Sequence, residues 1–405
     1  MQRRKAVKKI VFVVEGMYLG GVETTLINWL KTINIKTVDV TLMLKDVEGE
    51  LLKKVPKYIK IERISGLSEV LNGSILNRIR WVIKDRGIFA MFKLIVYVIL
   101  FKITKNKGIY YSRMINFLNN KNVSYDIAIS YSMPDSIITT YVVNKINSKN
   151  HWMWCHVDID MYDKYTLKGL ENIYNKYDKI VNVSEYAKQT FEIRYPYLKK
   201  KSVCVLNIVN VEEIISKSLE SVDLNNDDNE ICILTVGRIN PQKGQDLIID
   251  ISKKLKKLNI KFKWYLLGPA QDKEYLKKIE NHLIINDLSD TIIYLGKSSN
   301  PYKYIKKCDI YVQPSRYEGF CTTITEAKVL AKPIVMTNVS GAKEQIDNYK
   351  NGIIVEFDAT LLCNAIKELI NNGVLREKMI NNLIENRKNI NKYNSFDDVM
   401  VYLLN

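Results

Sequence analysis

The stretch from Cys308 to Glu326 reads Cys-Asp-Ile-Tyr-Val-Gln-Pro-Ser-Arg-Tyr-Glu-Gly-Phe-Cys-Thr-Thr-Ile-Thr-Glu. Its first part predicts a short buried strand that ends at Pro314. Residues Ile324 to Ala331 predict a helix that stops before the next proline. Glu318 therefore lies on the loop between strand and helix, and Glu326 lies inside the helix. We expect the two carboxylates to face the same crevice.

The start of this helix, around Cys321 to Thr323, is a candidate anion site. The first backbone N–H groups of a helix have no partner within it, and they attract phosphate. Carboxylates beside these donors can accept hydrogen bonds from hydroxyl groups. This combination suits a sugar nucleotide.

A second motif runs from Leu234 to Gly244 and reads Leu-Thr-Val-Gly-Arg-Ile-Asn-Pro-Gln-Lys-Gly. It predicts a buried strand that enters a loop at Gly237. Arg238 and Lys243 would then lie at the carboxyl end of the strand, where open α/β sheets bind ligands. Two cations at that position suit a diphosphate, which arginine can bind through two hydrogen bonds. The alternative is a surface loop with two solvated cations.

The segment Glu15-Gly-Met-Tyr-Leu-Gly-Gly-Val-Glu23 follows the first predicted strand and precedes a helix. Gly20 and Gly21 allow the backbone to approach a ligand closely. The segment is not the Gly-x-Gly-x-x-Gly fingerprint, which argues against a dinucleotide-dependent dehydrogenase. A tight structural turn is the alternative.

His156 ends the predicted strand His151-Trp-Met-Trp-Cys-His. Alternation along a strand places it on one face with Trp152 and Trp154. It is either a ligand-binding group or a packed core histidine. The nearby Asp158-Ile-Asp160 spells Asp-x-Asp, a short metal–diphosphate motif, and we interpret this match as accidental.

The chain resembles the retaining glycosyltransferases of family 4, of the bacterial surface-polysaccharide type. The Glu-x7-Glu signature of that family matches Glu318 and Glu326, with Gly319 and Phe320 next to the first carboxylate. The family often has glycine where this chain has Cys321. The Gly-Arg-x-x-x-x-Lys-Gly pattern of the family matches the second motif, and the resemblance spans nearly the whole chain.

The resemblance implies a metal-independent hexosyltransferase with no cofactor, whose donor is a nucleotide diphosphate sugar, with UDP as the expected nucleotide. It implies that His156, Glu318, Arg238 and Lys243 take part in catalysis. It implies that the donor is bound by Gly20, Gly21, Gly237, Arg238, Lys243, Glu318, Gly319, Phe320, Cys321, Thr322, Thr323 and Glu326. Glu326 would hold the nucleotide ribose, Glu318 the sugar near its phosphate, and no residue serves as a nucleophile.

The implied fold class is α/β of the GT-B type, with two Rossmann-like doubly wound domains that face a central cleft. The 405 residues suit two domains. We expect an acceptor-side domain at 1–210, a linker at 211–230 and a nucleotide-sugar domain at 231–393. A C-terminal helix at about 394–405 is expected to pack back on the first domain.

The net charge of +17 is concentrated in the first half: residues 1–210 carry 34 Lys and Arg against 18 Asp and Glu. No nucleic-acid motif accompanies this excess, so an anionic lipid or a phosphorylated acceptor is the expected partner. The segment Ile88–Ile103 is apolar except for Lys93 and Lys102. It predicts either a buried core helix or a helix lying in a membrane interface, since it is short for a bilayer span.

The six cysteines are scattered with no Cys-x-x-Cys spacing, which indicates a reducing compartment. The first apolar run is too short for a signal peptide, so we expect a cytoplasmic protein, peripheral on the inner face of the membrane if the helix docks there. The hypothesis is a glycosyltransferase that acts on a glycan or lipid-linked acceptor in surface polysaccharide synthesis. The alternatives are a catalytically inactive GT-B scaffold that binds a partner or membrane, and a nucleotide-sugar epimerase.

Overall fold

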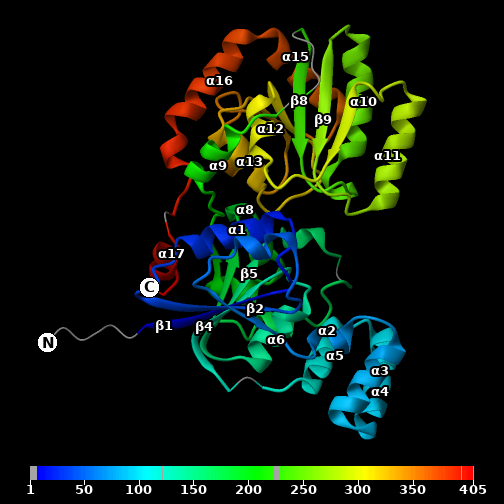
Figure 1. Cartoon of the computed structure of the whole chain (residues 1–405), viewed down its shortest axis with the longest axis vertical. Coiled ribbons are helices and arrows are strands. Elements are labelled where there is room, and N and C mark those ends of the chain that lie inside the picture. The colour runs from blue at the N-terminus through cyan, green and yellow to red at the C-terminus, as the bar shows by residue number, and fades with distance from the viewer. Residues whose placement is uncertain are drawn as a thin grey trace, which may run out of the picture. The chain divides into compact units, whose positions relative to one another are not determined.

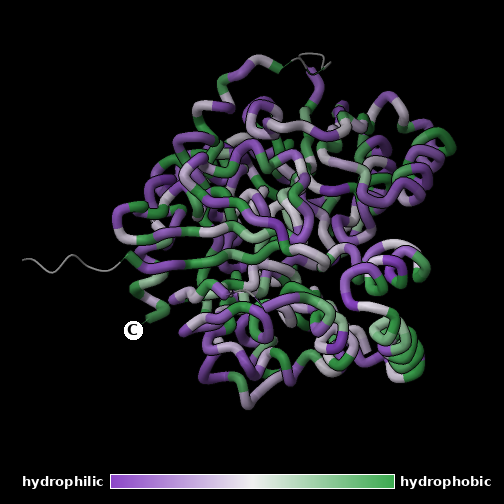
Figure 2. The backbone as a smooth tube through the Cα atoms, turned by 60° about the horizontal axis from the view of Figure 1, so that its bottom comes forward, coloured by the Kyte–Doolittle hydropathy of each residue, from purple (hydrophilic) through white to green (hydrophobic). Residues whose placement is uncertain are grey.

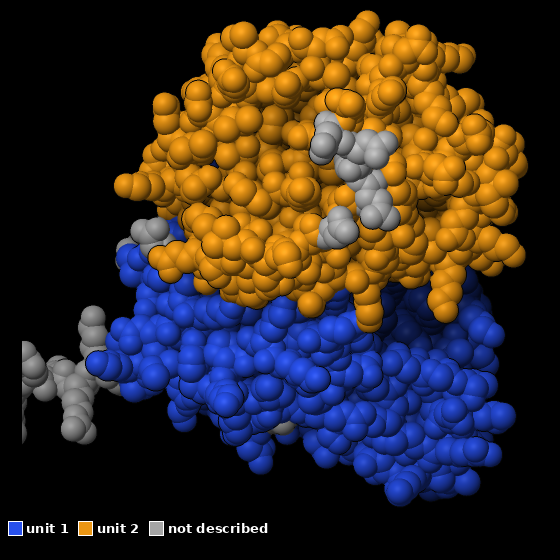
Figure 3. All heavy atoms as spheres, turned by 45° about the horizontal axis from the view of Figure 1, so that its top comes forward, with its two compact units in different colours: residues 1–206, 393–405 blue, residues 207–392 orange. Residues whose placement is uncertain are grey.

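The chain divides into two compact units, each built around one parallel sheet (Figures 1 and 3). The computed structural model describes residues 7–120, 122–163, 165–222, 224, 229–393 and 395–404. The first unit comprises residues 1–206 and 393–405, and the second comprises residues 207–392. The α/β class and the GT-B type of architecture expected from the sequence are confirmed.

The first unit holds a seven-stranded sheet in the order β3-β2-β1-β4-β5-β6-β7, with every pairing parallel. Its strands are β1 (Lys8–Val14), β2 (Val38–Leu44), β3 (Lys60–Arg63), β4 (Ser124–Tyr131), β5 (Asn147–Cys155), β6 (Lys179–Asn182) and β7 (Ser202–Cys204). The strand order reverses between β1 and β4. Open α/β sheets bind ligands at the carboxyl ends of the strands at such a reversal.

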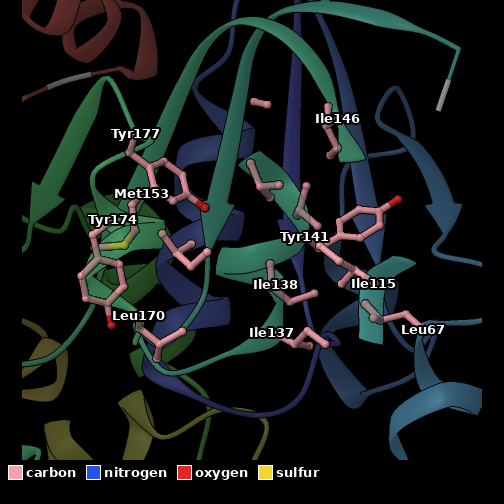
Figure 4. Packing of buried hydrophobic residues seen from close by; sticks show 14 of the residues in the cluster. Leu67, Ile115, Ile137, Ile138, Tyr141, Ile146, Met153, Leu170, Tyr174 and Tyr177 are labelled. Carbon is pink, nitrogen blue, oxygen red and sulfur yellow. The ribbon is translucent and has the colours of Figure 1, made fainter. Parts of the chain in front are cut away.

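Helices cover both faces of this sheet, as a parallel sheet requires. The α-helices of the first unit are α1 (Gly21–Lys31), α2 (Leu67–Leu71), α3 (Ile75–Arg86), α4 (Ile88–Thr104), α5 (Lys107–Met114), α6 (Ile137–Lys145), α7 (Glu171–Tyr174), α8 (Glu185–Arg194) and α17 (Phe396–Leu404). Short 3-10 turns are η1 (Glu50–Lys54), η2 (Ile115–Phe117), η3 (Ile159–Met161) and η4 (Pro196–Lys201). Figure 4 shows part of the apolar core, in which Ile138 and Tyr141 of α6 point toward neighbouring core side chains.

The last helix, α17, belongs to the first unit although it ends the chain. Its Phe396 lies among buried aromatic rings, with centroid distances of 5.2 Å to Phe12, 6.1 Å to Trp29 and 6.4 Å to Trp154. Its backbone N–H donates to Thr32 Oγ1 at 3.0 Å. Burial of these large rings, rather than local helix propensity, holds this short helix in place.

The second unit holds a six-stranded parallel sheet in the order β10-β9-β8-β11-β12-β13. Its strands are β8 (Ile231–Val236), β9 (Phe262–Leu267), β10 (Ile292–Gly296), β11 (Ile310–Gln313), β12 (Ile334–Thr337) and β13 (Ile353–Val355). Here the order reverses between β8 and β11. Alternate residues of β8 face opposite sides, so Ile233 joins one apolar cluster and Leu234 the other, and the strand reads as a continuous apolar run.

Helices again cover both faces of the second sheet. They are α9 (Val211–Ser218), α10 (Gln245–Lys257), α11 (Lys273–Ile285), α12 (Tyr302–Lys307), α13 (Thr322–Val329), α14 (Ala342–Gln345), α15 (Ala359–Asn371) and α16 (Gly373–Glu385), with 3-10 turns η5 (Pro241–Lys243) and η6 (Arg387–Asn389). One apolar cluster includes residues of α10, α11 and α15, and the other includes residues of α9, α12 and α13.

The linker expected at 211–230 needs correction at its start, because Val211–Ser218 forms helix α9. Ile214 is buried, and Asn210 caps the helix by accepting from the backbone N–H of Glu213 at 2.9 Å. The apolar residues in this segment recur at helical spacing and pack on the second sheet. Positions 223 and 225–228, in the polar part of the expected linker, lie outside the described residues.

Helices α3 and α4 form an outlying hairpin of the first unit (Figure 1). The sequence at Ile88–Ile103 is compatible with a core helix and with an interfacial helix. In the structure only Leu94 of α4 is fully buried. The core interpretation is therefore wrong for most of this helix. None of the helices in the described part of the chain has the length and apolar character needed to cross a membrane.

Candidate active site

The site of the second unit forms where two loops leave the adjacent strands β8 and β11. One loop carries Arg238 and Lys243, and the other runs from Pro314 to Glu318. Gly244 has φ +69°, and a Cβ atom on it would lie 2.0 Å from the carbonyl oxygen of Pro314. Only glycine fits at that position. The two motifs singled out in the sequence are thus brought into direct contact.

Lys243 and Glu318 form an ion pair at the centre of this junction. The Nζ–Oε1 distance is 2.5 Å, and both side chains are largely buried. Burial alone would lower the pKa of Lys243, but the charge and hydrogen bond of Glu318 raise it above its usual value. The pairing therefore favours the charged form of Lys243.

A chain of buried hydrogen bonds fixes the position of the Glu318 carboxylate. Ser315 Oγ donates to Glu318 Oε1 at 2.6 Å and accepts from Gln313 Nε2 at 2.9 Å. The amide oxygen of Gln313 accepts from the hydroxyl groups of Tyr311 and Thr323. Both hydrogen bonds to Glu318 end on Oε1. Among the described contacts Oε2 has none, so this oxygen is the one that can accept from a ligand hydroxyl.

Arg316 ties the two loops together at their exposed edge. Its guanidinium donates two hydrogen bonds to the Asp246 carboxylate, at 2.8 and 2.6 Å, and one to the carbonyl oxygen of Pro241 at 2.6 Å. It also lies 4.7 Å from the ring centroid of Phe357. Burial would raise the pKa of Asp246, but the hydrogen bonds from Arg316 and Tyr275 lower it overall. This bidentate contact holds the turn that carries Lys243.

The Arg238 side chain is half-buried, and its guanidinium has no hydrogen bond or ion pair with any described residue. Its backbone oxygen accepts from Gln245 Nε2 at 2.9 Å, which fixes the loop. The positive charge of Arg238 acts to lower the pKa of Lys243, which shows that the two cations influence each other. An anion bound beside them would relieve this repulsion.

Helix α13 begins at Thr322, two residues earlier than predicted, with Cys321 as its N-cap and no side-chain cap. The Cys321 N–H donates to Gln345 Oε1, and Gln345 Nε2 donates back to the Cys321 oxygen at 2.8 Å. This exchange anchors the segment that follows Gly319 and Phe320. Thr322 and Thr323 are partly exposed, so the helix start remains accessible to an anion.

Glu326 lies in a different environment from Glu318. It is 6% exposed and hydrogen-bonds the hydroxyl of Tyr302 from α12. Burial raises its pKa to about 8, although the bond from Tyr302 acts in the opposite direction. No described hydrogen bond or ion pair joins the two carboxylates, so the prediction that both face one crevice stays a prediction.

In the first unit, Gly20 and Gly21 mark the start of α1 after strand β1. Gly20 is the N-cap in extended backbone, and no side chain caps the helix. The Gly21 oxygen accepts from Thr25 Oγ1 at 2.8 Å. The pair therefore lies beside the reversal of strand order between β1 and β4, where the sequence predicted a ligand-facing segment.

His156 follows the last residue of β5. Its side chain is buried, and both ring nitrogens lack a hydrogen-bond partner among the described residues. Its ring lies 4.2 Å from that of Tyr131, whose buried hydroxyl is also unpartnered. Burial lowers the pKa of His156 to about 3, so the imidazole is neutral near pH 7. A neutral imidazole offers one donor and one acceptor, which suits a ligand hydroxyl.

Asp158 has a structural role. Its Oδ1 accepts from the Asp160 N–H at 3.0 Å and from Thr190 Oγ1 at 2.8 Å. It thereby caps η3 and ties it to α8. These contacts fit the interpretation of the Asp-x-Asp match as accidental.

Comparisons with known proteins find similarity to glycosyltransferases. The family described as "Glycosyl transferases group 1" matches residues 216–386, which include both motifs. An uncharacterized glycosyltransferase of Methanocaldococcus jannaschii is 32% identical over 275 residues, 66% of this chain and 70% of the relative. A Campylobacter jejuni relative, N-acetylgalactosamine-N,N'-diacetylbacillosaminyl-diphospho-undecaprenol 4-alpha-N-acetylgalactosaminyltransferase, is 28% identical and covers 62% of this chain and 68% of its own.

Solved structures share the fold at low sequence identity. Anabaena HepE in complex with UDP-glucose aligns with a TM-score of 0.67 at 16% identity and covers 95% of this chain and 98% of its own. Staphylococcus aureus TarM aligns with a TM-score of 0.68 at 15% identity and covers 98% and 100%.

A first prediction concerns the contact between the two loops. Gly244→Ala should destabilise the second unit by at least about 2 kcal/mol more than Gly296→Ala does. The two glycines have nearly equal φ, +69° and +74°, but a Cβ on Gly296 meets no atom within 4 Å. The pair therefore separates backbone strain from the clash with Pro314. Urea unfolding of the two variants measures the difference, and equal losses would contradict the contact.

A second prediction concerns Glu326. Its pKa of about 8 in the folded protein exceeds its ordinary value of 4.5, so the folded state holds more protons between these values. Stability should therefore fall as pH rises from about 4.5 to 8. Glu326→Gln should remove this component, and its advantage in unfolding temperature over the native protein should grow across that range. Parallel curves for the two proteins would contradict the shift.

Proposed function

The chain belongs to the group 1 glycosyltransferases, and from this premise we propose that it is a retaining, metal-independent enzyme. It moves a sugar from a nucleotide diphosphate, with UDP as the nucleotide, to a glycan or lipid-linked acceptor. The observation that carries the proposal is the junction of Lys243, Glu318 and Arg238 at the reversal of strand order in the second unit. There, cations for a diphosphate adjoin a carboxylate oxygen for a sugar hydroxyl.

The reaction builds negative charge on the departing nucleoside diphosphate. Arg238, which has no described partner, would bind this charge directly. Lys243 keeps two of its three ammonium donors after its bond to Glu318. The first N–H groups of α13 would add a third source of positive potential. These groups would stabilise the leaving diphosphate without a metal ion.

Glu318 would orient the sugar rather than attack it. Its Oε1 is occupied by Lys243 and Ser315, which leaves Oε2 to accept from a sugar hydroxyl. In the first unit, a neutral His156 can both donate and accept, and it would hydrogen-bond a hydroxyl of a bound substrate. With no side chain assigned as nucleophile, the acceptor oxygen would bond to the anomeric carbon on the face where the bond to the diphosphate breaks. A phosphate oxygen of the leaving group would take the acceptor's proton, and the anomeric configuration would be retained.

The acceptor class draws on the relatives. The Campylobacter jejuni relative is named for a diphospho-undecaprenol acceptor, and a Staphylococcus aureus relative, 28% identical over 162 residues, is named for capsular polysaccharide biosynthesis. It covers 40% of this chain and 41% of its own. An acceptor linked to lipid requires the enzyme to work at a membrane surface. We therefore include contact of Ile88–Ile103 with the membrane in the proposed function.

A thermal-shift screen against a panel of nucleotide sugars tests donor binding, and release of nucleoside diphosphate from the best donor tests turnover. Arg238→Met should lower kcat by about 10²–10³-fold, because it removes a cation at the leaving diphosphate. Lys261→Met, a change of the same kind at an exposed site on the second unit, is the matched control and should leave kcat unchanged.

Two measurements separate the remaining parts of the proposal. Turnover should persist in EDTA, and NMR of the fresh product should show the anomeric configuration of the donor. An inverted product would overturn the retaining mechanism. A chain that binds none of the nucleotide sugars would overturn the enzyme and favour an inactive scaffold.

A third measurement addresses the role of Glu326 at the ribose. Hydroxyl groups that donate to its carboxylate favour the charged form and lower its pKa from about 8. Donor binding near pH 7 should therefore release a fraction of a proton. Calorimetric titrations in buffers of different ionisation enthalpy measure this release, and Glu326→Gln should abolish it. Equal heats in all buffers for the native protein would argue against the ribose role.

A further inference from the structure

Helix α4 exposes a continuous apolar stripe. Phe89, Phe92, Val96, Ile99 and Ile103 follow one another at spacings of three and four residues, which places them on one side of an α-helix. All five are exposed, with Phe89 at 81% and Ile103 at 74%. Figure 2 draws most of this helix in green, the colour of hydrophobic residues. A contiguous exposed face of this kind marks an interaction surface.

The opposite side of α4 is also apolar, and it is the side that packs on the protein. Leu94 is fully buried there, and Ala90, Tyr97 and Val98 pack partly buried against the core of the first unit. Phe101 stacks on Tyr110 of α5 at a centroid distance of 4.3 Å. The fold therefore already uses this side of α4 for packing, and the exposed stripe is not needed for packing within the described part of the first unit. A helix that is hydrophobic all round is normally covered on all sides.

Basic residues frame the stripe. Lys93 follows Phe92 and Lys102 precedes Ile103, so at 3.6 residues per turn they lie on opposite edges of the apolar face. Residues 75–107 carry eight Lys and Arg against one acidic residue, Asp85. Lysine stems can lie along an apolar layer while their ammonium groups reach an anionic one. An apolar stripe between two cationic edges complements an anionic lipid surface.

We propose that α4 docks the first unit onto an anionic bilayer, with the helix lying in the plane of the interface and the stripe Phe89–Ile103 in the acyl boundary. Its 17 residues are fewer than the roughly 20 needed to span the hydrocarbon core. Lys93 and Lys102 contact the headgroups on either side. The docking surface stands on its own geometry, whereas the statement that it brings the enzyme to a lipid-linked acceptor rests on the proposed function.

Vesicle flotation of the full chain tests the proposal. The native protein should float with vesicles of equimolar phosphatidylglycerol and phosphatidylcholine, less with phosphatidylcholine alone, and less as salt screens the charges. Phe92→Asp and Ile99→Asp should each weaken binding by about tenfold or more. The double change Lys93→Glu and Lys102→Glu should weaken binding relative to the native protein on the anionic vesicles only.

The matched control is Ile193→Asp, at a 78% exposed isoleucine on α8 of the same unit, which should float as the native protein does. Circular dichroism and thermal unfolding confirm that each variant folds, and the milder Phe92→Ser replaces any variant that does not. Unchanged flotation of folded Phe92→Asp and Ile99→Asp would overturn the proposal. So would a native dimer in solution that these changes dissociate, since a second copy would then cover the stripe.

Donor turnover is measured on the same native preparation, so that two failures can be told apart. A native protein that floats but turns over no nucleotide sugar overturns the proposed transferase activity and leaves the docking surface standing. A protein that turns over donor but does not float overturns the docking surface, and with it the membrane contact in the proposed function, and leaves the transferase activity standing.

Discussion

The buried ion pair between Lys243 and Glu318 is the constraint around which the second unit is organised. Two charges this far from water are tolerated only when each satisfies the other and further hydrogen bonds complete the set. That requirement draws the loops after β8 and β11 together, and the contact in turn demands glycine at position 244. The polar chain behind Ser315 and the bidentate contact of Arg316 are then the supports that keep this pair in one geometry.

The sequence predicted the parts that depend on local pattern. Strand runs, glycines at turns and the two motifs of the second unit are local features of the sequence, so the loop that carries Glu318 could be predicted, and the family resemblance implied the fold class. Contacts between distant segments could not be predicted. The pairing of Lys243 with Glu318 depends on which strands lie side by side, and periodicity does not report strand order.

Two helices could not be assigned from the sequence, each for a physical reason. The short amphipathic repeat of α9 runs directly into polar residues typical of a linker, so the segment predicts a linker rather than a helix. Helix α4 could not be assigned because both of its faces are apolar, so hydropathy alone cannot tell which face packs on the protein. In the structure Leu94 is the buried residue, and Phe92 and Val96 are not. The missing hydrogen bonds of the His156 ring could likewise not be predicted, because they depend on which of the described residues lie around the ring in the fold.

The position of α17 determines when the first unit can finish folding during synthesis. The ribosome completes residues 207–392 before it reaches Phe396, so the second unit can fold while the aromatic core of the first still lacks one of its rings. Phe12, Trp29 and Trp154 emerge earlier, yet their rings are fully covered only after Phe396 has been made. The first unit is therefore begun before the second and completed after it, and a truncation that removes Phe396 leaves the defect in the first unit.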